Sequence, residues 1–356
     1  MSGYDFPVTR TEDPKSKPDQ NNLGFGEYFT DHMFLMDYDE SGGWRCGRIV
    51  PYAPLAVDPA AAVFHYAQEA FEGLKAYSMP DGGIALFRPY ENARRSNISS
   101  ARLCIPSIDE ELYVEAIRAL VKTDADWVPK AEGTSLYIRP FIIATEAFMG
   151  LRPAKKYIFC IILSPVGSYY KEGLKPTRIF VEDEYVRSAP GGTGFAKTGG
   201  NYAASLLSLE KARRQGCAQV LWLDGAERKY VEEIGTSNAF FVKDGTVFTP
   251  PLTGTILPGI TRGSVIELLK SWGIDTVESK FTIEEIFEAH RQGRLSEVFA
   301  TGTAAVISPV GEILWKGDSI AINSKETGPV ALKLYEAITG IQSGKAEDLF
   351  SWTLSV

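Results

Sequence analysis

Short apolar runs separated by amphipathic stretches fill most of the chain, a pattern typical of a protein that mixes strands and helices. The run Gln219–Leu223 predicts a buried strand because all but its first residue are apolar. Residues 135–143 predict another strand, on which Tyr137 and Arg139 share a face because strand side chains alternate with a period of two. Further strands are expected at 23–38, 44–50, 84–87, 157–163, 178–185 and 297–305, a hairpin at 240–248, a strand or short helix at 60–65, and helices at 92–103, 110–125, 201–215, 264–272, 283–292 and 329–338.

The predicted elements fall into two groups, separated by a polar stretch at 167–177 that glycine and proline bound. We therefore expect an α+β protein with a smaller N-terminal α/β domain at 21–166, an interdomain linker at 167–177 and a larger C-terminal domain at 178–356. Residues 1–20 are polar and charged and lack the apolar segment of a signal peptide, so they are expected to form a disordered tail.

Composition and charge disfavour several classes of protein. The formal net charge of −8 argues against a nucleic-acid partner, and no apolar run reaches the length of a membrane-spanning helix. The four cysteines are widely spaced and form no C-x-x-C pair, which indicates buried free thiols in a cytoplasmic protein. The three histidines share no metal-binding spacing, so we expect no metal site and no histidine-based triad.

The stretch 188–202 carries the strongest chemical signal, because Lys197 lies there between two clusters of glycines. Glycine lets the backbone approach a ligand closely, and Asn201 is a good N-cap for the helix that follows. Three interpretations remain open at this point. Lys197 forms a Schiff base, or it belongs to a phosphate loop in which Ala196 replaces the usual glycine, or it is a solvated surface lysine.

Other segments offer groups for a phosphate or a protonated ring. Arg88 directly follows a predicted strand, where its guanidinium either binds a phosphate or forms a surface ion pair. Glu232 and Glu233 lie in an apolar strand, where a buried carboxylate needs a partner such as a pyridinium, whereas a half-buried strand would leave both in solvent. Residues 257–263 open a helix and 301–305 form a small-residue turn, and each either presents N–H groups to an anion or is a plain turn.

Together these groups match the needs of pyridoxal 5'-phosphate (PLP), which requires an amine for an imine, a phosphate cradle and an acid near its ring nitrogen. An ATP-binding P-loop protein is the alternative from another class. It would need an acidic residue after an apolar strand, a requirement that Asp224 satisfies only weakly.

The chain resembles the branched-chain amino-acid aminotransferases, a family of PLP enzymes of fold type IV. The resemblance runs from about Phe25 to the C-terminus and rests on several motifs in the family's order, which together are far more specific than any one of them. It implies a two-domain fold whose C-terminal domain is a mixed-sheet pseudo-barrel. The motifs are F-T-D-H-M (29–33), F-E-G-L-K (71–75), L-F-R-P (86–89), L-Y-I-R-P (136–140), K-T-G-G-N-Y (197–202), E-I-G-T-S-N (233–238), L-P-G-I-T-R (257–262) and T-G-T-A-A (301–305).

The resemblance implies reversible ping-pong transamination between L-leucine, L-isoleucine or L-valine and 2-oxoglutarate. Lys197 would be the Schiff-base and acid–base residue, and Glu233 would pair with the pyridine nitrogen. The implied cofactor-binding residues are Arg88, Arg187, Lys197, Tyr202, Glu233, Thr236, Ile260, Thr261 and Thr303. The implied substrate-binding residues are Phe25, Tyr66, Phe71, Tyr137, Arg139, Thr303 and Ala304.

The resemblance also implies a homodimer, to which a loop near 149–155 contributes. Some family members carry a redox C-x-x-C where this chain has residues 305–308, so no thiol switch is expected. Three alternatives stay open within PLP chemistry: a D-amino-acid aminotransferase, an aminodeoxychorismate lyase, and a PLP-binding regulator without turnover.

Overall fold

The structure, a computed structural model, describes residues 4–167 and 174–356, so residues 168–173 of the predicted linker lie outside the described residues. Contacts within the chain divide it into two compact units. The first unit comprises Met1–Tyr169, Ala196–Gly199 and Gly340–Val356, and the second comprises Tyr170–Phe195 and Gly200–Thr339.

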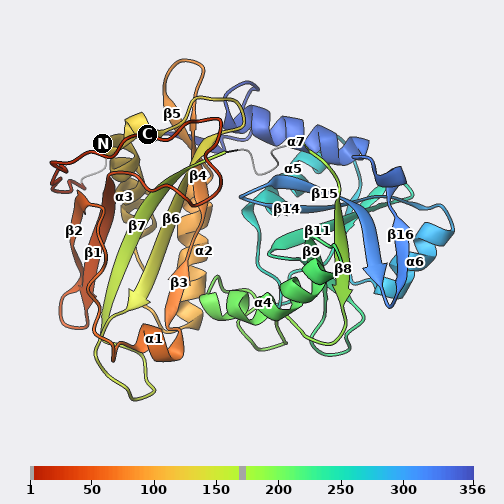
Figure 1. The fold of residues 1–356 in the computed structure, drawn as a ribbon, viewed down its shortest axis with the longest axis horizontal. Coiled ribbons are helices and arrows are strands. Elements are labelled where there is room, and N and C mark those ends of the chain that lie inside the picture. The colour runs from red at the N-terminus through yellow and green to blue at the C-terminus, as the bar shows by residue number, and fades with distance from the viewer. Residues whose placement is uncertain (1–3, 168–173) are drawn as a thin grey trace. The chain divides into compact units, whose positions relative to one another are not determined.

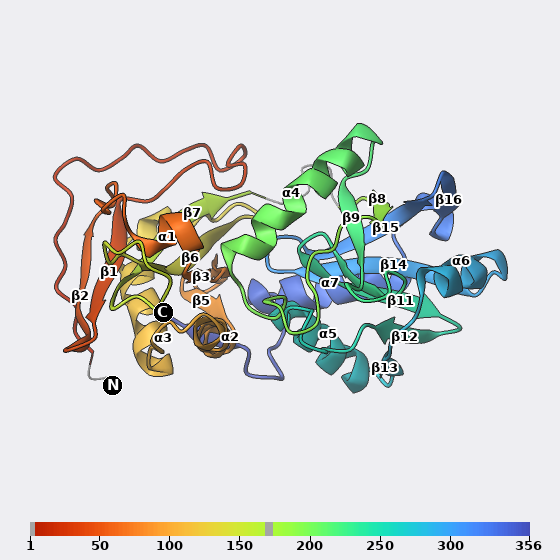
Figure 2. The ribbon, with the colours of Figure 1, turned by 90° about the horizontal axis from the view of Figure 1, so that it is seen from below.

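The first unit is built on one antiparallel sheet of eight strands, with two helices packed against one face (Figure 1, Figure 2). The strand order is β17-β5-β4-β6-β7-β1-β2, and β3 lies beside β6. Helix α3 joins the core because its buried residues, among them Tyr113 and Ile117, recur every three or four positions. The elements of this unit are β1 (His32–Asp39), β2 (Gly43–Pro51), α1 (Ala62–Tyr66), β3 (Glu69–Phe71), β4 (Leu74–Ser78), β5 (Ile84–Phe87), α2 (Pro89–Arg102), α3 (Glu110–Thr123), η1 (Ala125–Trp127), β6 (Ser135–Ala144), β7 (Lys156–Val166) and β17 (Thr353–Ser355).

The second unit contains a mixed sheet of nine strands, six of which close into a barrel. The path β10-β9-β8-β15-β14-β11 returns to its start because β10 also pairs with β11. Strand β8 runs parallel to both of its neighbours. This arrangement confirms the predicted mixed-sheet pseudo-barrel. The elements are β8 (Thr177–Glu182), α4 (Gly199–Arg214), β9 (Gln219–Leu223), β10 (Val231–Ile234), β11 (Ser237–Lys243), β12 (Thr246–Thr249), α5 (Ile260–Ser271), β13 (Thr276–Glu278), α6 (Ile283–Arg291), β14 (Leu295–Gly302), β15 (Val306–Trp315), β16 (Asp318–Ala321), η2 (Asn323–Lys325) and α7 (Pro329–Gln342), with α4 beginning and α7 ending in residues of the first unit.

The two units differ from the predicted domains in their boundaries. The C-terminal strand β17 pairs with β5, so the end of the chain belongs to the first unit. The segment Ala196–Gly199, which contains Lys197, belongs there too. The first unit is therefore the larger in residue number and not the smaller. Pairing between strands so far apart in the chain leaves no local signal in the sequence.

The predicted strand at 23–38 is shorter than expected and begins only at His32. Gly24 and Gly26 have φ values of 62° and 73°, which turn the chain before the strand starts. Two of the four cysteines, Cys46 and Cys104, are exposed, which corrects the prediction that the free thiols are buried. None of the described helices is long and apolar enough to cross a membrane.

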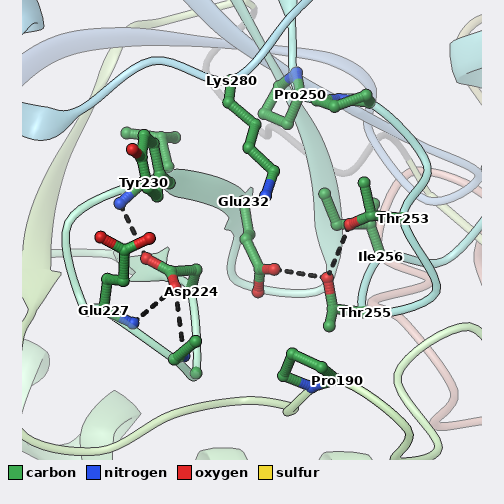
Figure 3. Close-up of a pocket in the computed structure, with 14 residues that line it drawn as sticks. Pro190, Asp224, Glu227, Tyr230, Glu232, Pro250, Thr253, Thr255, Ile256 and Lys280 are labelled. Carbon is green, nitrogen blue, oxygen red and sulfur yellow. Dashed lines mark hydrogen bonds between the residues drawn. The ribbon is translucent and has the colours of Figure 1, made fainter.

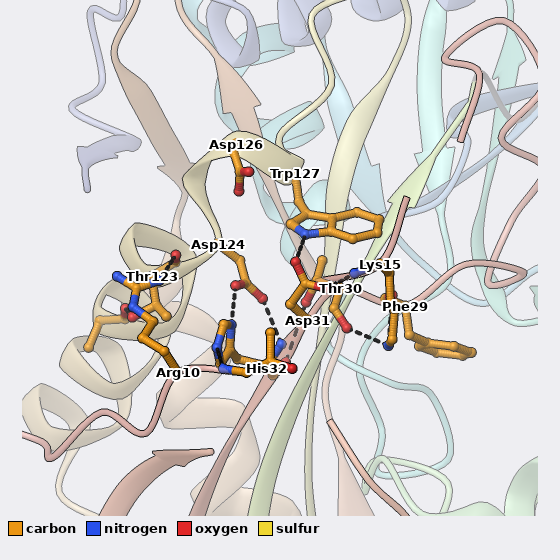
Figure 4. A network of polar contacts seen from close by, with 12 residues as sticks. Arg10, Lys15, Phe29, Thr30, Asp31, His32, Thr123, Asp124, Asp126 and Trp127 are labelled. Atoms are coloured by element: carbon orange, nitrogen blue, oxygen red, sulfur yellow. Dashed lines mark hydrogen bonds and ion pairs between the residues drawn. The ribbon is translucent and has the colours of Figure 1, made fainter. Parts of the chain in front are cut away.

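The N-terminal segment 4–20 is ordered along the first unit, which corrects the predicted disordered tail. It runs beside the edge strand β2, where Thr9 N donates to Ile49 O at 2.9 Å. Further along, Lys15 N donates to Asp31 Oδ1 at 2.8 Å, and the Lys15 ammonium donates to backbone carbonyls just before β1 (Figure 4). An edge strand offers unpaired backbone groups to any neighbouring segment, and composition alone does not reveal such a partner.

A buried polar network holds this segment and β1 to the end of α3 (Figure 4). His32 Nδ1 lies 2.6 Å from Asp124 Oδ1, and its Nε2 accepts from Thr11 N at 3.1 Å. Asp31 Oδ2 accepts from the indole N–H of Trp127 at 2.8 Å. Asp31 and His32, two of the three polar residues of the F-T-D-H-M motif, thus have a structural role.

A second buried network joins β3 to α2. Glu72 is fully buried, and the guanidinium of Arg95 donates to both of its carboxylate oxygens at 2.8 Å, with Asn92 Nδ2 adding a bond of 2.7 Å. Burial by itself would raise the pKa of Glu72, but the charge and hydrogen bonds of Arg95 hold it below its ordinary value. The pair is fully desolvated, so each partner depends on the other.

We expect Arg95→Leu to lower the free energy of unfolding by about 3–5 kcal/mol, because it leaves the Glu72 carboxylate buried without its cation. Arg94→Leu is the matched control: this arginine lies on the same helix, is half-exposed and pairs only with surface glutamates. It should change stability by less than about 1 kcal/mol. Urea denaturation of both variants measures the difference, and equal losses would contradict a dominant role for the buried pair.

Candidate active site

Lys197 is fixed through its backbone to the first unit. Its N–H donates to Ser99 Oγ on α2 at 2.8 Å, and its carbonyl accepts from Phe71 N at 3.0 Å. The ammonium lies 4.9 Å from the centroid of the Phe71 ring, a cation–π distance. Lys197 is half-buried, so it is not the solvated surface lysine of the third interpretation.

Glu69 of β3 closes the other side of the lysine segment. Its Oε1 accepts from the hydroxyl of Thr198 at 3.1 Å and from Gly199 N, the first N–H of α4. Burial raises the pKa of Glu69, and these two hydrogen bonds oppose that rise. Glu69 thus acts as the acid at the N-terminus of α4, a role that sequence reasoning missed because the residue lies more than a hundred positions away.

Helix α4 begins at Gly199, two residues before the predicted N-cap. Asn201 lies inside the first turn, where its side chain accepts from Thr193 Oγ1 at 2.7 Å and donates to Thr193 O at 2.8 Å. Asn201 therefore closes the glycine loop and does not cap the helix. Tyr202 follows it in the same turn and is half-buried.

Four of the predicted substrate residues form one group in the first unit. The Arg139 guanidinium lies 4.9 Å from the centroid of the Phe71 ring and 5.3 Å from that of Tyr137, and its Nη2 donates to the Tyr137 hydroxyl at 2.9 Å. The Phe25 ring packs edge-on against Tyr137 at 5.0 Å. Arg139 Nε is buried without a hydrogen-bond partner among the described residues. The group combines aromatic surface with one cation.

Two further residues of the first unit, Tyr66 and Arg88, have other neighbours. The Tyr66 hydroxyl donates to the carbonyl of Met149, and its ring neighbours His65. Arg88 caps α2 in a left-handed conformation with φ 49°, which is uncommon for a residue with a side chain. Its N–H donates to Trp352 O at 2.7 Å, and its guanidinium lies 5.1 Å from the Trp352 ring. The C-terminal segment therefore fixes Arg88.

In the second unit, Glu233 and Arg187 form a buried ion pair. Arg187 Nη2 contacts Glu233 Oε2, while Glu233 Oε1 accepts from Asn238 Nδ2 at 3.3 Å. The same Arg187 Nη2 donates to Thr255 O at 2.6 Å and to Gly194 O at 3.1 Å. The structure thus places Arg187 on the carboxylate of Glu233. The supporting role of Asn238 was not predictable from the sequence, beyond the place of this residue in the E-I-G-T-S-N motif.

Two segments of the second unit, at the start of α5 and in the turn between β14 and β15, carry the residues predicted to bind an anion. Ile260 and Thr261 open α5, whose N-cap Gly259 makes no side-chain hydrogen bond to the first turn, so these N–H groups point out of the helix. A Cβ at Gly259 would stand 1.9 Å from Asn238 Oδ1, which requires glycine there. Thr303 and Ala304 lie half-buried in the turn between β14 and β15. Thr236 is exposed, in the turn between β10 and β11.

Each unit by itself carries groups whose chemistry suits a phosphorylated pyridine aldehyde. The second unit supplies a buried carboxylate that can pair with a protonated ring nitrogen, and N–H groups at the start of the 12-residue helix α5 that suit a phosphate. The first unit supplies a fixed lysine and an arginine held at a helix start. Lysine, phosphate cradle and ring acid are the three groups that PLP requires. No cluster of histidine, cysteine, aspartate or glutamate among the described residues is arranged to hold a metal ion.

Fold and site define a class IV aminotransferase. The model of the amino-transferase class IV family matches residues 69–313, and the chain belongs to this family, whose members use PLP. This family assignment excludes the alternative of an ATP-binding P-loop protein.

The relatives of the chain are named for one kind of aminotransferase within this family. It is 57% identical, over 100% of its length and 98% of the relative's, to branched-chain-amino-acid aminotransferase 2 of Bacillus subtilis (strain 168). It is 55% identical to branched-chain-amino-acid transaminase 1 of the same organism, over 96% of each chain. The structure of the Escherichia coli branched-chain amino acid aminotransferase is similar, with a TM-score of 0.74 and 31% identity over 90% of this chain and 98% of that one. The enzyme from Thermoproteus uzoniensis, solved with norvaline, has a TM-score of 0.76 at 26% identity, over 91% and 99%.

We expect Glu69→Ala to loosen the lysine segment. Removing the acid from the start of α4 costs about 1 kcal/mol locally, so hydrogen exchange in residues 197–202 should quicken roughly fivefold. Glu91→Ala, which removes an exposed acid from the first turn of α2, is the control and should leave that segment unchanged. Equal hydrogen exchange in both variants would mean that the hydrogen bonds with Ser99 and Phe71 are enough to hold the lysine segment in place.

Proposed function

We propose that the enzyme transfers the amino group reversibly between L-leucine, L-isoleucine or L-valine and 2-oxoglutarate, with PLP attached to Lys197 as a Schiff base. The observation that carries the proposal is the fixed, half-buried lysine, bonded through its backbone to Ser99 and Phe71. The names of the Bacillus subtilis relatives, at more than half identity over almost the whole chain, support the branched-chain substrates.

When bound, PLP supplies a carbonyl that condenses with amines and a ring that withdraws electrons from the substrate Cα. Lys197 would hold the cofactor through its amine, and that amine, once free, would take up and return the proton at the substrate Cα. Glu233 keeps the ring nitrogen protonated. Arg187 pairs with the Glu233 carboxylate and holds it in one orientation, so little reorganisation would be needed when charge develops. Arg88, Ile260, Thr261 and Thr303 would hold the phosphate, Tyr202 would donate to the ring hydroxyl, and Thr236 would be a further cofactor-binding residue.

The aromatic side chains grouped around Arg139 in the first unit support the proposed branched-chain substrates. Phe25, Phe71 and Tyr137 offer apolar surface for an isobutyl or isopropyl side chain, and Tyr66 would contact the same side chain. Such a surface separates leucine, isoleucine and valine poorly, because one methylene contributes about 1–3 kcal/mol. Arg139 lies within this group and meets the distal carboxylate of glutamate in the second half-reaction, while Thr303 and Ala304 take the α-carboxylate.

We further propose that the enzyme is a homodimer and is located in the cytoplasm. Met149 and Leu151 are 67% and 84% exposed on one loop, an apolar surface of the kind that a second subunit covers. The exposed thiols of Cys46 and Cys104 carry no disulfide, which suits a reducing compartment.

Lys197→Ala should keep the fold and abolish transfer of nitrogen from L-leucine to 2-oxoglutarate. The loss is expected because no other amine then releases the cofactor or moves the Cα proton. Lys211→Ala, on the helix that follows, removes a lysine whose ammonium pairs with Glu184 at the surface and should retain activity. The measurement is the rate of glutamate formation by the purified variants. Turnover by the Lys197 variant would contradict the proposed catalytic role of this residue.

Glu233→Gln should lower kcat by roughly a hundredfold or more, while the enzyme still binds PLP. A neutral amide cannot hold the ring nitrogen protonated, whereas the phosphate contacts that dominate cofactor binding remain. The measurement is kcat together with the PLP content of the purified variant. An unchanged kcat would assign the ring nitrogen to Glu232 or to another group.

A further inference from the structure

A cavity of about 250 Å³ lies within the second unit, beside β10 (Figure 3). Part of its wall is apolar, formed by three prolines together with Val231 and Ile256. The remainder is polar and carries both signs of charge. Its lining residues are Pro190, Asp224, Gly225, Ala226, Glu227, Tyr230, Val231, Glu232, Pro250, Pro251, Thr253, Thr255, Ile256 and Lys280.

Two of the three acids at this cavity are already satisfied within the chain. The carboxylate of Asp224 accepts from the N–H groups of Ala226, Glu227, Lys229 and Tyr230, and so closes the loop that follows β9. Burial tends to raise the pKa of Asp224, but these bonds bring it below its ordinary value. Glu227 forms an ion pair with Lys229 at 2.5 Å.

Glu232 is the acid that remains incompletely bonded. It is 6% exposed; its Oε1 accepts from the Thr255 hydroxyl, and its Oε2 is buried without a hydrogen-bond partner among the described residues. Figure 3 shows its carboxylate bonded to the Thr255 hydroxyl, and the Lys280 side chain entering the cavity from the opposite side, with its ammonium near the start of the Glu232 side chain. Among the described residues Lys280 forms no ion pair, and its ammonium lies 5.5 Å from the centroid of the Tyr230 ring.

We propose that this cavity is a binding site for a small zwitterion that carries an ammonium and a carboxylate, such as a free amino acid. The ammonium donates to Glu232 Oε2, the carboxylate pairs with Lys280, and the apolar part of the ligand packs on the prolines. A buried acceptor without a donor is costly, and a ligand N–H group satisfies it with a charge-assisted bond. Two acids, or two bases, at the positions of Glu232 and Lys280 would instead favour a ligand with charge of one sign only.

The site is connected to Glu233 by two short paths. Glu232 and Glu233 are neighbours in β10, whose pairing with β9 is irregular between Val231 and Ile234. Thr255 donates its hydroxyl to Glu232, and its carbonyl accepts from Arg187 Nη2, the atom that also pairs with Glu233. Occupancy of the cavity should therefore alter kcat more than KM; this second part rests on the proposed function.

The test is calorimetric titration of the PLP-loaded enzyme with L-proline. Proline is a zwitterion with an apolar body, and as a secondary amine it is not a donor in transamination. We expect saturable binding of one molecule per chain, and binding at least about tenfold weaker in Lys280→Ala and in Glu232→Gln. Lys316→Ala is the matched control, because that exposed lysine also lies over a ring, that of Trp315, at 4.7 Å. It should bind proline as the native enzyme does.

Glycine betaine gives a second control, since its nitrogen carries charge but no N–H group and so cannot satisfy Glu232 Oε2. Weak or absent betaine binding supports the proposal, and betaine binding equal to that of proline overturns it. Absence of proline binding, or binding that the Lys280 variant retains in full, also overturns it. Because heat of binding is measured without turnover, failure here is distinguishable from failure of the proposed transamination, which would appear as an inactive enzyme that still binds proline.

Discussion

A lysine amine is useful as a nucleophile only if its backbone holds it in one place, and in this chain the first unit supplies that constraint. Ser99 and Phe71 bond to the two sides of the Lys197 peptide, and Glu69 fixes the turn that leads into α4. Behind them, the buried pair of Glu72 and Arg95 locks β3 to α2, the two elements that carry these partners. The lysine position is therefore a consequence of how β3 packs against α2, although the lysine is distant from both in sequence.

The second unit solves the complementary problem of keeping an acid ionised inside a protein. A carboxylate as buried as that of Glu233 would take up a proton if it had no cation nearby. Arg187 provides the cation, and backbone carbonyls of Gly194 and Thr255 fix the guanidinium in turn. The barrel makes this possible because β10 closes against both β9 and β11, so that the strand is held on both edges. A ring nitrogen brought to this carboxylate would meet a charge that is already oriented.

The elements whose pattern lies within a few neighbouring residues were predictable from the sequence. The buried strand at Gln219–Leu223 matches its prediction, and the shared face of Tyr137 and Arg139 follows from alternation and is seen in their hydrogen bond. What the sequence missed depends on contacts between distant residues. The order of segment 4–20 comes from the backbone of β2 and from Asp31, the pairing of β17 with β5 comes from the opposite end of the chain, and the cap of α4 is supplied by Glu69. No window of neighbouring residues contains those partners. The family motifs marked Lys197, Glu233 and Arg88, but they did not reveal that Arg187 pairs with Glu233.

The most direct test of the central claim is the absorption spectrum of the purified enzyme, before and after addition of L-leucine with no oxo acid present. The account predicts a visible band from PLP bound to Lys197, and its conversion to the spectrum of the pyridoxamine form as leucine delivers its amino group. A visible band that leucine leaves unchanged would contradict the branched-chain half-reaction while keeping the cofactor. No band after PLP is supplied would contradict the account of Lys197 itself.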